Sequence, residues 1–220
     1  FVPGAGKPAG VRSANGRNYY IQGGLLARDA FNGVMLWYQS IKGLNNRLVI
    51  ASGNEVYLPR DGEIVALDGA NGKILRSYGK TEGCQNLLLA GGLLLSFEPK
   101  SLRAFEAATG KEKWASPEGA SGGSPLSAGG KVFFMKGGLV CLDLADGKLA
   151  WKKDVRAFGG MTFAFTDKLL FCAGGIKYTA LSAKDGAEVW SYTSIKPQGD
   201  ETYFAGGLVW IQSPDDRASR

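Results

Sequence analysis

The sequence predicts an all-β protein, a β-propeller of four-stranded antiparallel blades. Three observations support this fold class. A glycine recurs at positions 33, 72, 110, 147 and 186, so one segment repeats with a period of about 38 residues. Each repeat holds four apolar runs of strand length, separated by turn residues. No window has the apolar spacing of a helix, and four short strands per repeat are typical of a propeller blade.

The repeat assigns the elements in chain order. The second blade serves as the pattern, with strands expected at 47–52, 55–58, 63–68 and 73–78. Asn-Gly and Asp-Gly steps favour tight hairpins, because these residues accept the positive φ that such turns require. Residues 1–10 are expected to be irregular and 214–220 to form a truncated tail. The blades are assigned to residues 11–40, 47–78, 86–116, 124–154, 162–193 and, in part, 202–213.

The repeats give about five and a half blades, and propellers typically close with four to eight blades. An open arc would leave strand edges unpaired. We therefore expect the chain to be part of a ring of seven or eight blades. A ring closed by five blades stays open as an alternative. A β-solenoid is the alternative architecture, although its coils are usually shorter.

Composition excludes several classes of function. The sequence has no histidine, so these 220 residues cannot supply Ser-His-Asp or Cys-His catalysis, or a histidine ligand for zinc or haem. The net charge is +6, but the basic residues are scattered among acidic ones, so no nucleic-acid partner is expected. No apolar run is long enough to cross a membrane. Cys84, Cys141 and Cys172 are far apart in the sequence, and each lies near apolar residues.

The repeated segment assigns a structural role to four positions. A small residue opens it, an acidic residue follows two positions later, a glycine completes the turn, and a tryptophan lies four residues after the glycine. We expect the tryptophan to pack between adjacent blades, because it is the largest apolar side chain in the unit. In the second repeat Arg76 replaces it, and we expect a stacked guanidinium there. The predicted docking residues are Trp37, Arg76, Trp114, Trp151, Trp190, Gly33, Gly72, Gly110, Gly147 and Gly186.

This pattern resembles the tryptophan-docking motif of the pyrroloquinoline quinone (PQQ) repeat propellers. The resemblance covers residues 11–213, with Glu106 and Ser182 departing from the aspartate of the motif and Arg76 from the tryptophan. That family includes quinoprotein dehydrogenases and the outer-membrane assembly lipoprotein, which has no cofactor. The resemblance implies a bacterial extracytoplasmic protein, in the periplasm or at the cell surface.

The first functional hypothesis is a non-catalytic scaffold that binds a protein partner or an extracytoplasmic ligand. Propellers gather loops at the mouth of the central channel, where binding usually occurs. The polar residues expected there lie in the turns after the second strands. They are Arg60, Asp61, Glu98, Lys100 and Lys136. No catalytic residue and no metal ligand is assigned.

The alternative is a portion of a PQQ-dependent quinoprotein dehydrogenase, whose catalytic residues would lie in missing blades. The resemblance implies PQQ and calcium as cofactors in that case. The sequence has no adjacent cysteines, no assignable Glu/Asn/Asp metal set and no C-x-x-C-H haem motif. Hydrolysis of a carbohydrate by a carboxylate pair is a third hypothesis, but no pair can be chosen from the sequence.

Overall fold

The structure is a computed structural model. Its described residues are 10–119, 124–154, 162–166, 169–174, 177–193, 202–205 and 208–211. The predicted irregular segment, apart from Gly10, and the predicted tail 214–220 lie outside the described residues. The chain divides into two compact units, 1–120 and 121–220.

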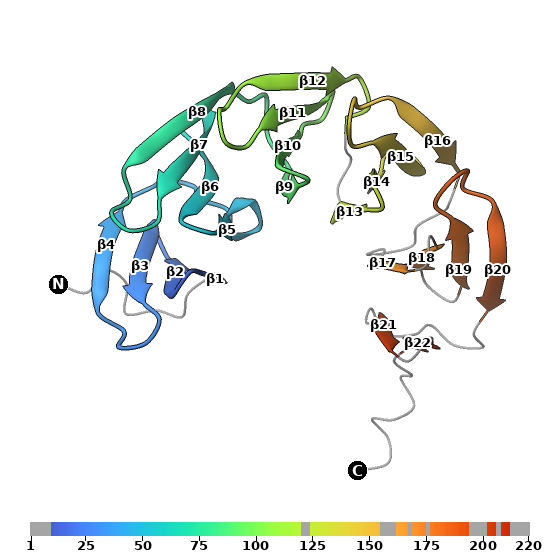
Figure 1. Cartoon of the computed structure of the whole chain (residues 1–220), viewed down its shortest axis with the longest axis horizontal. Coiled ribbons are helices and arrows are strands. Elements are labelled where there is room, and N and C mark those ends of the chain that lie inside the picture. The colour runs from blue at the N-terminus through green and yellow to red at the C-terminus, as the bar shows by residue number, and fades with distance from the viewer. Residues whose placement is uncertain are drawn as a thin grey trace, which may run out of the picture. The chain divides into compact units, whose positions relative to one another are not determined.

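The first unit contains three four-stranded antiparallel sheets, which we call blades 1 to 3 (Figure 1). Within each blade the strands pair in chain order. Blade 1 consists of β1 (Gly10–Ala14), β2 (Arg17–Ile21), β3 (Leu25–Asp29) and β4 (Met35–Gln39). Blade 2 consists of β5 (Ile50–Ser52), β6 (Glu55–Arg60), β7 (Glu63–Asp68) and β8 (Ile74–Lys80). Blade 3 consists of β9 (Asn86–Ala90), β10 (Leu93–Phe97), β11 (Leu102–Glu106) and β12 (Glu112–Ser116).

The second unit contains two further blades and a two-stranded sheet. Blade 4 consists of β13 (Leu126–Ala128), β14 (Lys131–Met135), β15 (Leu139–Asp143) and β16 (Leu149–Lys153). Blade 5 consists of β17 (Thr162–Thr166), β18 (Leu169–Gly174), β19 (Lys177–Ser182) and β20 (Glu188–Thr193). The last sheet pairs β21 (Thr202–Ala205) with β22 (Leu208–Ile211). The predicted fold class is confirmed, and the division of the chain at the predicted blade boundaries stays a prediction.

Three strands of blade 2 differ in their bounds from the sequence-based expectation: β6 extends to Arg60, β8 extends to Lys80, and β5 begins later. The first strand of blade 2 was expected to begin at residue 47, but a short 3-10 turn, η1 (Asn46–Leu48), precedes β5. The side chain of Asn45 accepts a hydrogen bond from the backbone N–H of Arg47 at 3.0 Å. This local bond offers the backbone an alternative to strand pairing, so the strand begins later, at Ile50.

The repeated turn is built by side chains that bind nearby backbone N–H groups. In blade 1, Asp29 Oδ1 accepts from the backbone N–H of Phe31 at 2.9 Å and of Asn32 at 3.0 Å. Gly33 then adopts a φ of 73°, which a residue with a side chain reaches only at a steric cost. Every blade has a β-bulge directly after the small residue that opens the segment. These local features explain why the motif recurs at a fixed spacing.

Two tryptophans dock on the hairpin of the following blade. Trp37 Nε1 donates to the carbonyl oxygen of Gly69 at 2.9 Å, which joins blades 1 and 2. Trp151 Nε1 donates to the carbonyl oxygen of Ala183 at 3.0 Å, which joins blades 4 and 5. Both indole rings lie close against the motif glycine of that hairpin, since a Cβ on Gly72 or Gly186 would lie within 3.0 Å of ring atoms. Each of these tryptophans therefore packs against the hairpin of the next blade and also donates a hydrogen bond to it.

The apolar core is divided into clusters between adjacent blades. One cluster joins blades 1 and 2 and includes Trp37 with Val56 and Leu67. Trp114 is 9% exposed, whereas Trp190 of blade 5 is 38% exposed. For Trp37 and Trp151 the docking hairpin lies between the third and fourth strands of the next sheet. Two strands are described after blade 5, so the corresponding position for Trp190 lies outside the described residues.

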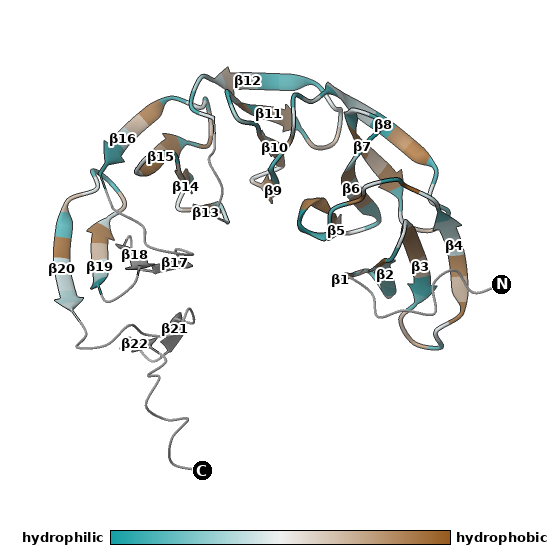
Figure 2. Ribbon diagram, turned by 180° about the vertical axis from the view of Figure 1, so that it is seen from behind, coloured by the Kyte–Doolittle hydropathy of each residue, from teal (hydrophilic) through white to brown (hydrophobic). Residues whose placement is uncertain are grey.

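The outer strands differ in character between blades. Figure 2 shows a hydrophobic stretch in β8 and a mostly hydrophilic β12. Ile74 and Leu75 of β8 are 53% and 47% exposed, and Met35 and Leu36 of β4 are 51% and 41% exposed. Packing between blades therefore leaves these apolar side chains in contact with solvent.

We expect Gly72→Ala to lower the free energy of unfolding by about 1–3 kcal/mol more than Gly33→Ala, because the added methyl collides with the Trp37 ring. Gly33 is the matched control, since its φ of 73° equals the 74° of Gly72 within a degree and nothing lies within 4 Å of its Cβ position. Urea unfolding of the two variants measures the difference. Equal losses would contradict close docking of the indole on this hairpin.

Candidate functional site

The first unit gathers two predicted turns around one loop. Thr81 begins the loop that leads from β8 of blade 2 into β9 of blade 3. Its backbone N–H donates to the carbonyl oxygen of Gly62, in the turn that follows Arg60 and begins at Asp61. Its hydroxyl donates to Glu98 Oε1 at 3.0 Å, next to the turn that holds Lys100. Thr81 therefore links the turns of blades 2 and 3 on the face where binding was expected.

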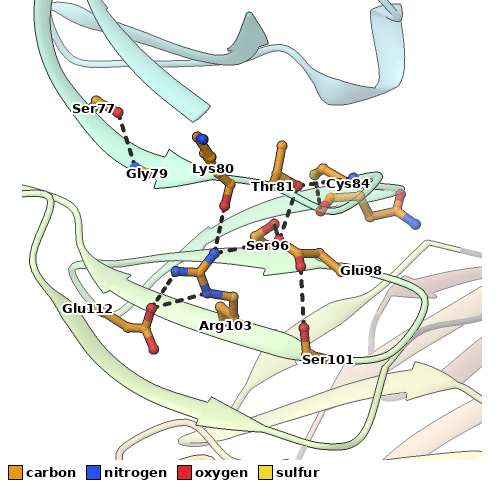
Figure 3. A network of polar contacts seen from close by, with 11 residues as sticks. Ser77, Gly79, Lys80, Thr81, Cys84, Ser96, Glu98, Ser101, Arg103 and Glu112 are labelled. Carbon is orange, nitrogen blue, oxygen red and sulfur yellow. Dashed lines mark hydrogen bonds and ion pairs between the residues drawn. The ribbon is translucent and has the colours of Figure 1, made fainter. Parts of the chain in front are cut away.

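Glu98 is buried, unlike the other residues proposed for this face. It is 3% exposed and lies directly after β10. Besides Thr81, the hydroxyls of Ser96 and Ser101 donate to its carboxylate at 3.1 and 3.3 Å (Figure 3). A guanidinium nitrogen of Arg103 lies 4.0 Å away. The carboxylate thus accepts hydrogen bonds from within the protein, and it does not line the mouth as a solvent-exposed residue.

The network around Glu98 holds the loop Thr81–Gln85 in place. The backbone N–H of Cys84 donates to Thr81 Oγ1 at 3.1 Å, and that of Gln85 to the carbonyl oxygen of Phe97 at 2.8 Å. Arg103 donates to the carbonyl oxygen of Lys80 at 2.7 Å, at the start of the loop (Figure 3). The tip of the loop, Glu82 and Gly83, is exposed. The two ends of the loop are thus held by hydrogen bonds, and its tip is exposed to solvent.

Arg60 and Asp61 lie at the adjacent turn of blade 2, where Arg60 is the last residue of β6 instead of a turn residue as expected, and Asp61 begins the turn. Arg60 donates to Gln39 Oε1 of blade 1 at 2.7 Å, so its side chain also bridges two blades. Its Nε lies 3.2 Å from Asp61 Oδ2. Asp61 adopts a φ of 51°, and its side chain is 88% exposed. Of the two residues, Asp61 therefore has the more accessible charge.

The two predicted lysines lie in different units. Lys100 is exposed in the turn between β10 and β11 of blade 3. Lys136 is half-buried in the turn between β14 and β15 of blade 4, where its backbone N–H donates to the carbonyl oxygen of Gly138 at 2.8 Å. The structure thus brings Arg60, Asp61 and Lys100 to one loop of the first unit, and Lys136 belongs to the second unit.

Sequence reasoning missed the residues that support the loop. Thr81, Ser96, Ser101 and Arg103 were not singled out, although each contacts Glu98. One signal was present: Ser96 interrupts the apolar run of β10 and Glu98 follows it two positions later, directly after the strand, so both are expected on the same side. Polar residues on a buried face require partners, and the hydroxyls nearby in the sequence could have supplied them.

The chemistry that this site offers is recognition through hydrogen bonds and charge. Burial raises the pKa of the Cys84 thiol to about 11, and the negative charge of Glu98 adds to the shift. The thiol is therefore protonated at neutral pH and is a weak nucleophile. In the described part of the chain, no three Cys, Asp or Glu side chains come together as a metal site would require. The described residues include no helix with the length and hydrophobicity that crossing a bilayer requires.

The raised pKa of Cys84 predicts a pH dependence of alkylation by iodoacetamide. Because only the thiolate reacts, the rate rises about tenfold per pH unit from pH 8 and levels off near the pKa of about 11. Peptide mass spectrometry resolves Cys84 from the other cysteines. In the urea-unfolded chain, the control, the rate should level off near the ordinary thiol pKa of about 8.5. A plateau near that value in the folded protein would contradict the burial of the thiol.

We expect Glu98→Ala to lower the free energy of unfolding by about 1–3 kcal/mol, because the hydroxyls of Thr81, Ser96 and Ser101 lose their acceptor. Glu82→Ala, at the exposed tip of the same loop, is the matched control and should change stability by no more than about 0.5 kcal/mol. Urea unfolding measures both. A neutral Glu98→Ala would show that the network does not stabilise the fold.

Comparison with known proteins identifies relatives of this chain. Residues 98–217, more than half of the chain, match the family described as outer membrane protein assembly factor BamB. No curated protein matches the sequence. The crystal structure of BamB from Moraxella catarrhalis is 18% identical with a TM-score of 0.69, and the match covers 90% of this chain and 67% of that one.

Two further solved structures share the fold. The computationally designed protein Ika8 is 11% identical with a TM-score of 0.71, covering 93% of this chain and 67% of that one. A quinohemoprotein alcohol dehydrogenase from Pseudomonas putida HK5 is 14% identical with a TM-score of 0.62, covering 86% of this chain and 42% of that one. Structural likeness at these identities concerns the fold alone. The family match, together with the repeated docking motif, places the chain in the BamB family of PQQ-like repeat propellers.

Proposed function

We propose that this propeller is a non-catalytic scaffold that binds a protein partner at the loop Thr81–Gln85 and the turns beside it. The observation that carries the proposal is the anchoring of this loop by Glu98, which leaves the tip exposed. An ordered loop loses less conformational entropy when it binds than a flexible one. Asp61 and Lys100 present charges of opposite sign on the adjoining turns, which suits recognition of a polar protein surface.

We infer that the partner belongs to the bacterial cell envelope, and that the protein acts in the periplasm or at the cell surface. This inference is supported by the family, which is described as an outer membrane protein assembly factor. The chain spans about two thirds of the Moraxella catarrhalis BamB structure and less than half of the quinohemoprotein dehydrogenase structure. What the whole protein does is therefore proposed here from the family and is not read from the matched structures.

Site-directed photo-crosslinking in the bacterial host tests this proposal. A photoreactive amino acid replaces Lys100 at the proposed site or, as the matched control, Lys113, which is exposed on β12 of the same blade. We expect position 100 to crosslink strongly to a protein of the outer-membrane assembly machinery and position 113 to do so weakly, because only the former adjoins the anchored loop. Mass spectrometry identifies the captured protein.

Two outcomes would contradict the proposal. Equal crosslinking from the two positions would place the partner elsewhere. Saturable uptake of PQQ in the presence of calcium, with dye-linked alcohol oxidation by the full-length protein, would instead support the quinoprotein alternative.

A further inference from the structure

Arg76 occupies the tryptophan position of blade 2 and reproduces one part of the tryptophan contact. Its Nε donates to the carbonyl oxygen of Ala107 at 2.8 Å. Ala107 holds the same motif position in blade 3 that Gly69 and Ala183 hold in blades 2 and 5, where they accept from indoles. The hydroxyl of Tyr78 donates to the same oxygen at 2.6 Å. The hydrogen bond is thus kept at this interface, whereas the indole ring is replaced by a cation.

A second departure from the repeat lies in the same blade and pairs with the first. The residue opposite the motif aspartate is a cation in two blades: Arg17 faces Asp29 in blade 1, and Lys131 faces Asp143 in blade 4. In blade 2 this position is Glu55, which forms an ion pair with Arg76. Tyr57 also donates to Glu55, at 2.7 Å. Arg76 in place of tryptophan and Glu55 in place of a cation compensate each other, because the carboxylate of Glu55 neutralises the guanidinium of Arg76.

The ion pair is partly buried and stays charged. The side chains of Arg76 and Glu55 are 19% and 24% exposed. Burial alone would lower the pKa of Arg76, but the hydrogen bonds to Tyr78 and Glu55 raise it above its ordinary value. Burial also raises the pKa of Tyr57, so this donor stays protonated. Removing both charges from water carries a free-energy cost, and a hydrophobic replacement of such a pair is often neutral or stabilising.

The motif glycine of blade 3 is more exposed to solvent than the motif glycines of blades 2 and 5. Gly72 and Gly186, under the rings of Trp37 and Trp151, are buried, whereas Gly110 is half-buried. A Cβ on Gly110 would lie 2.7 Å from the carbonyl oxygen of Ser77 and 3.8 Å from Cδ of Arg76, whereas at each of the other two glycines it would lie within 3.0 Å of ring atoms. The backbone of β8 and the aliphatic stem of Arg76 therefore lie where an aromatic ring packs at the other interfaces.

The loop that joins the two blades is also held by charged side chains. Thr81 is bound by Glu98, and Lys80 by Arg103 through its carbonyl oxygen. The inner part of the interface is apolar, with Tyr57 packed against Leu94 and Phe105 in one cluster. Charged contacts are thus concentrated at the outer strand and the connecting loop, and the apolar cluster between them also includes Tyr78 of β8 and Ala107 of the facing hairpin.

We propose that the outer part of the interface between blades 2 and 3, from Arg76 to the hairpin 106–111, is a hinge that opens before the corresponding parts of the tryptophan-docked interfaces. Local opening occurs where few apolar contacts oppose it. Opening releases the hairpin 106–111 from β8 and separates Ala107 from Tyr78 within the apolar cluster, while Tyr57, Leu94 and Phe105 of that cluster keep the two blades together. The Glu55–Arg76 pair sets how often the hinge opens.

Native-state hydrogen exchange of the full chain tests the hinge at three matched amides. The N–H of the motif glycine bonds to the first residue of its turn in each blade: Gly72 to Asp68 at 2.7 Å, Gly110 to Glu106 at 2.8 Å and Gly186 to Ser182 at 2.8 Å. After correction for intrinsic rates, we expect Gly110 to exchange about tenfold faster than Gly72 and Gly186 or more, because the charged pair opposes opening less than a docked indole does. Equal protection at the three glycines would overturn the proposal.

Two variants separate the hinge from other causes of fast exchange. Glu55→Gln should accelerate exchange at Gly110, since Arg76 then lacks its counter-charge. The double variant Arg76→Trp with Glu55→Lys restores the residue types of blade 4 and should slow Gly110 to the rate of Gly72. Asp146→Asn, which removes an exposed ion pair with Lys148, is the control and should leave Gly110 unchanged. An unaltered rate at Gly110 in Glu55→Gln, or faster exchange in the double variant, would overturn the proposal.

Discussion

The fold depends on one contact between consecutive blades, in which a long side chain of an outer strand donates a hydrogen bond to a carbonyl of the next hairpin. Trp37 and Trp151 make this contact with an indole N–H, and Arg76 makes it with a guanidinium N–H. The accepting carbonyl lies three residues before a glycine with positive φ, in the same hairpin turn. The motif thus combines a tight turn, a buried side chain and a hydrogen bond to the next blade. A repeat of this kind specifies both the structure of a blade and its attachment to the next one.

The same contact explains why the blades tolerate variation elsewhere. Each repeat interacts mainly with its neighbours, so its stability comes from its own hairpins and from the interfaces on either side. Outer strands range from apolar in blade 1 to charged in blade 3 without a change in strand pairing. An exchange at the interface itself needs compensation, and Glu55 supplies it for Arg76. At this interface, a charged side chain is accepted because two departures from the repeat occur together.

The candidate site follows from the position of Glu98 between two turns and a connecting loop. Its carboxylate binds hydroxyls from the loop, from β10 and from the following turn, so elements of blades 2 and 3 are ordered by one buried group. The residues left exposed around it are Asp61, Glu82 and Lys100. A buried polar network that is fully satisfied makes a rigid base, and a rigid base is what a binding loop requires. This division between buried support and exposed contact underlies the proposed scaffold function.

The sequence by itself determined the repeat, the four-stranded blades and the hairpin turns, because these depend on residues close together in the chain. The spacing of glycines and the Asn-Gly and Asp-Gly steps encode local backbone geometry, which can be inferred without neighbours in space. Only the tertiary structure decided that Glu98 is buried and that Arg76 pairs with Glu55, 21 residues away. Whether a charged side chain is buried depends on strands and loops brought together from separate parts of the chain. The residue types were visible in the sequence, but their partners were set by the packing of one blade against the next.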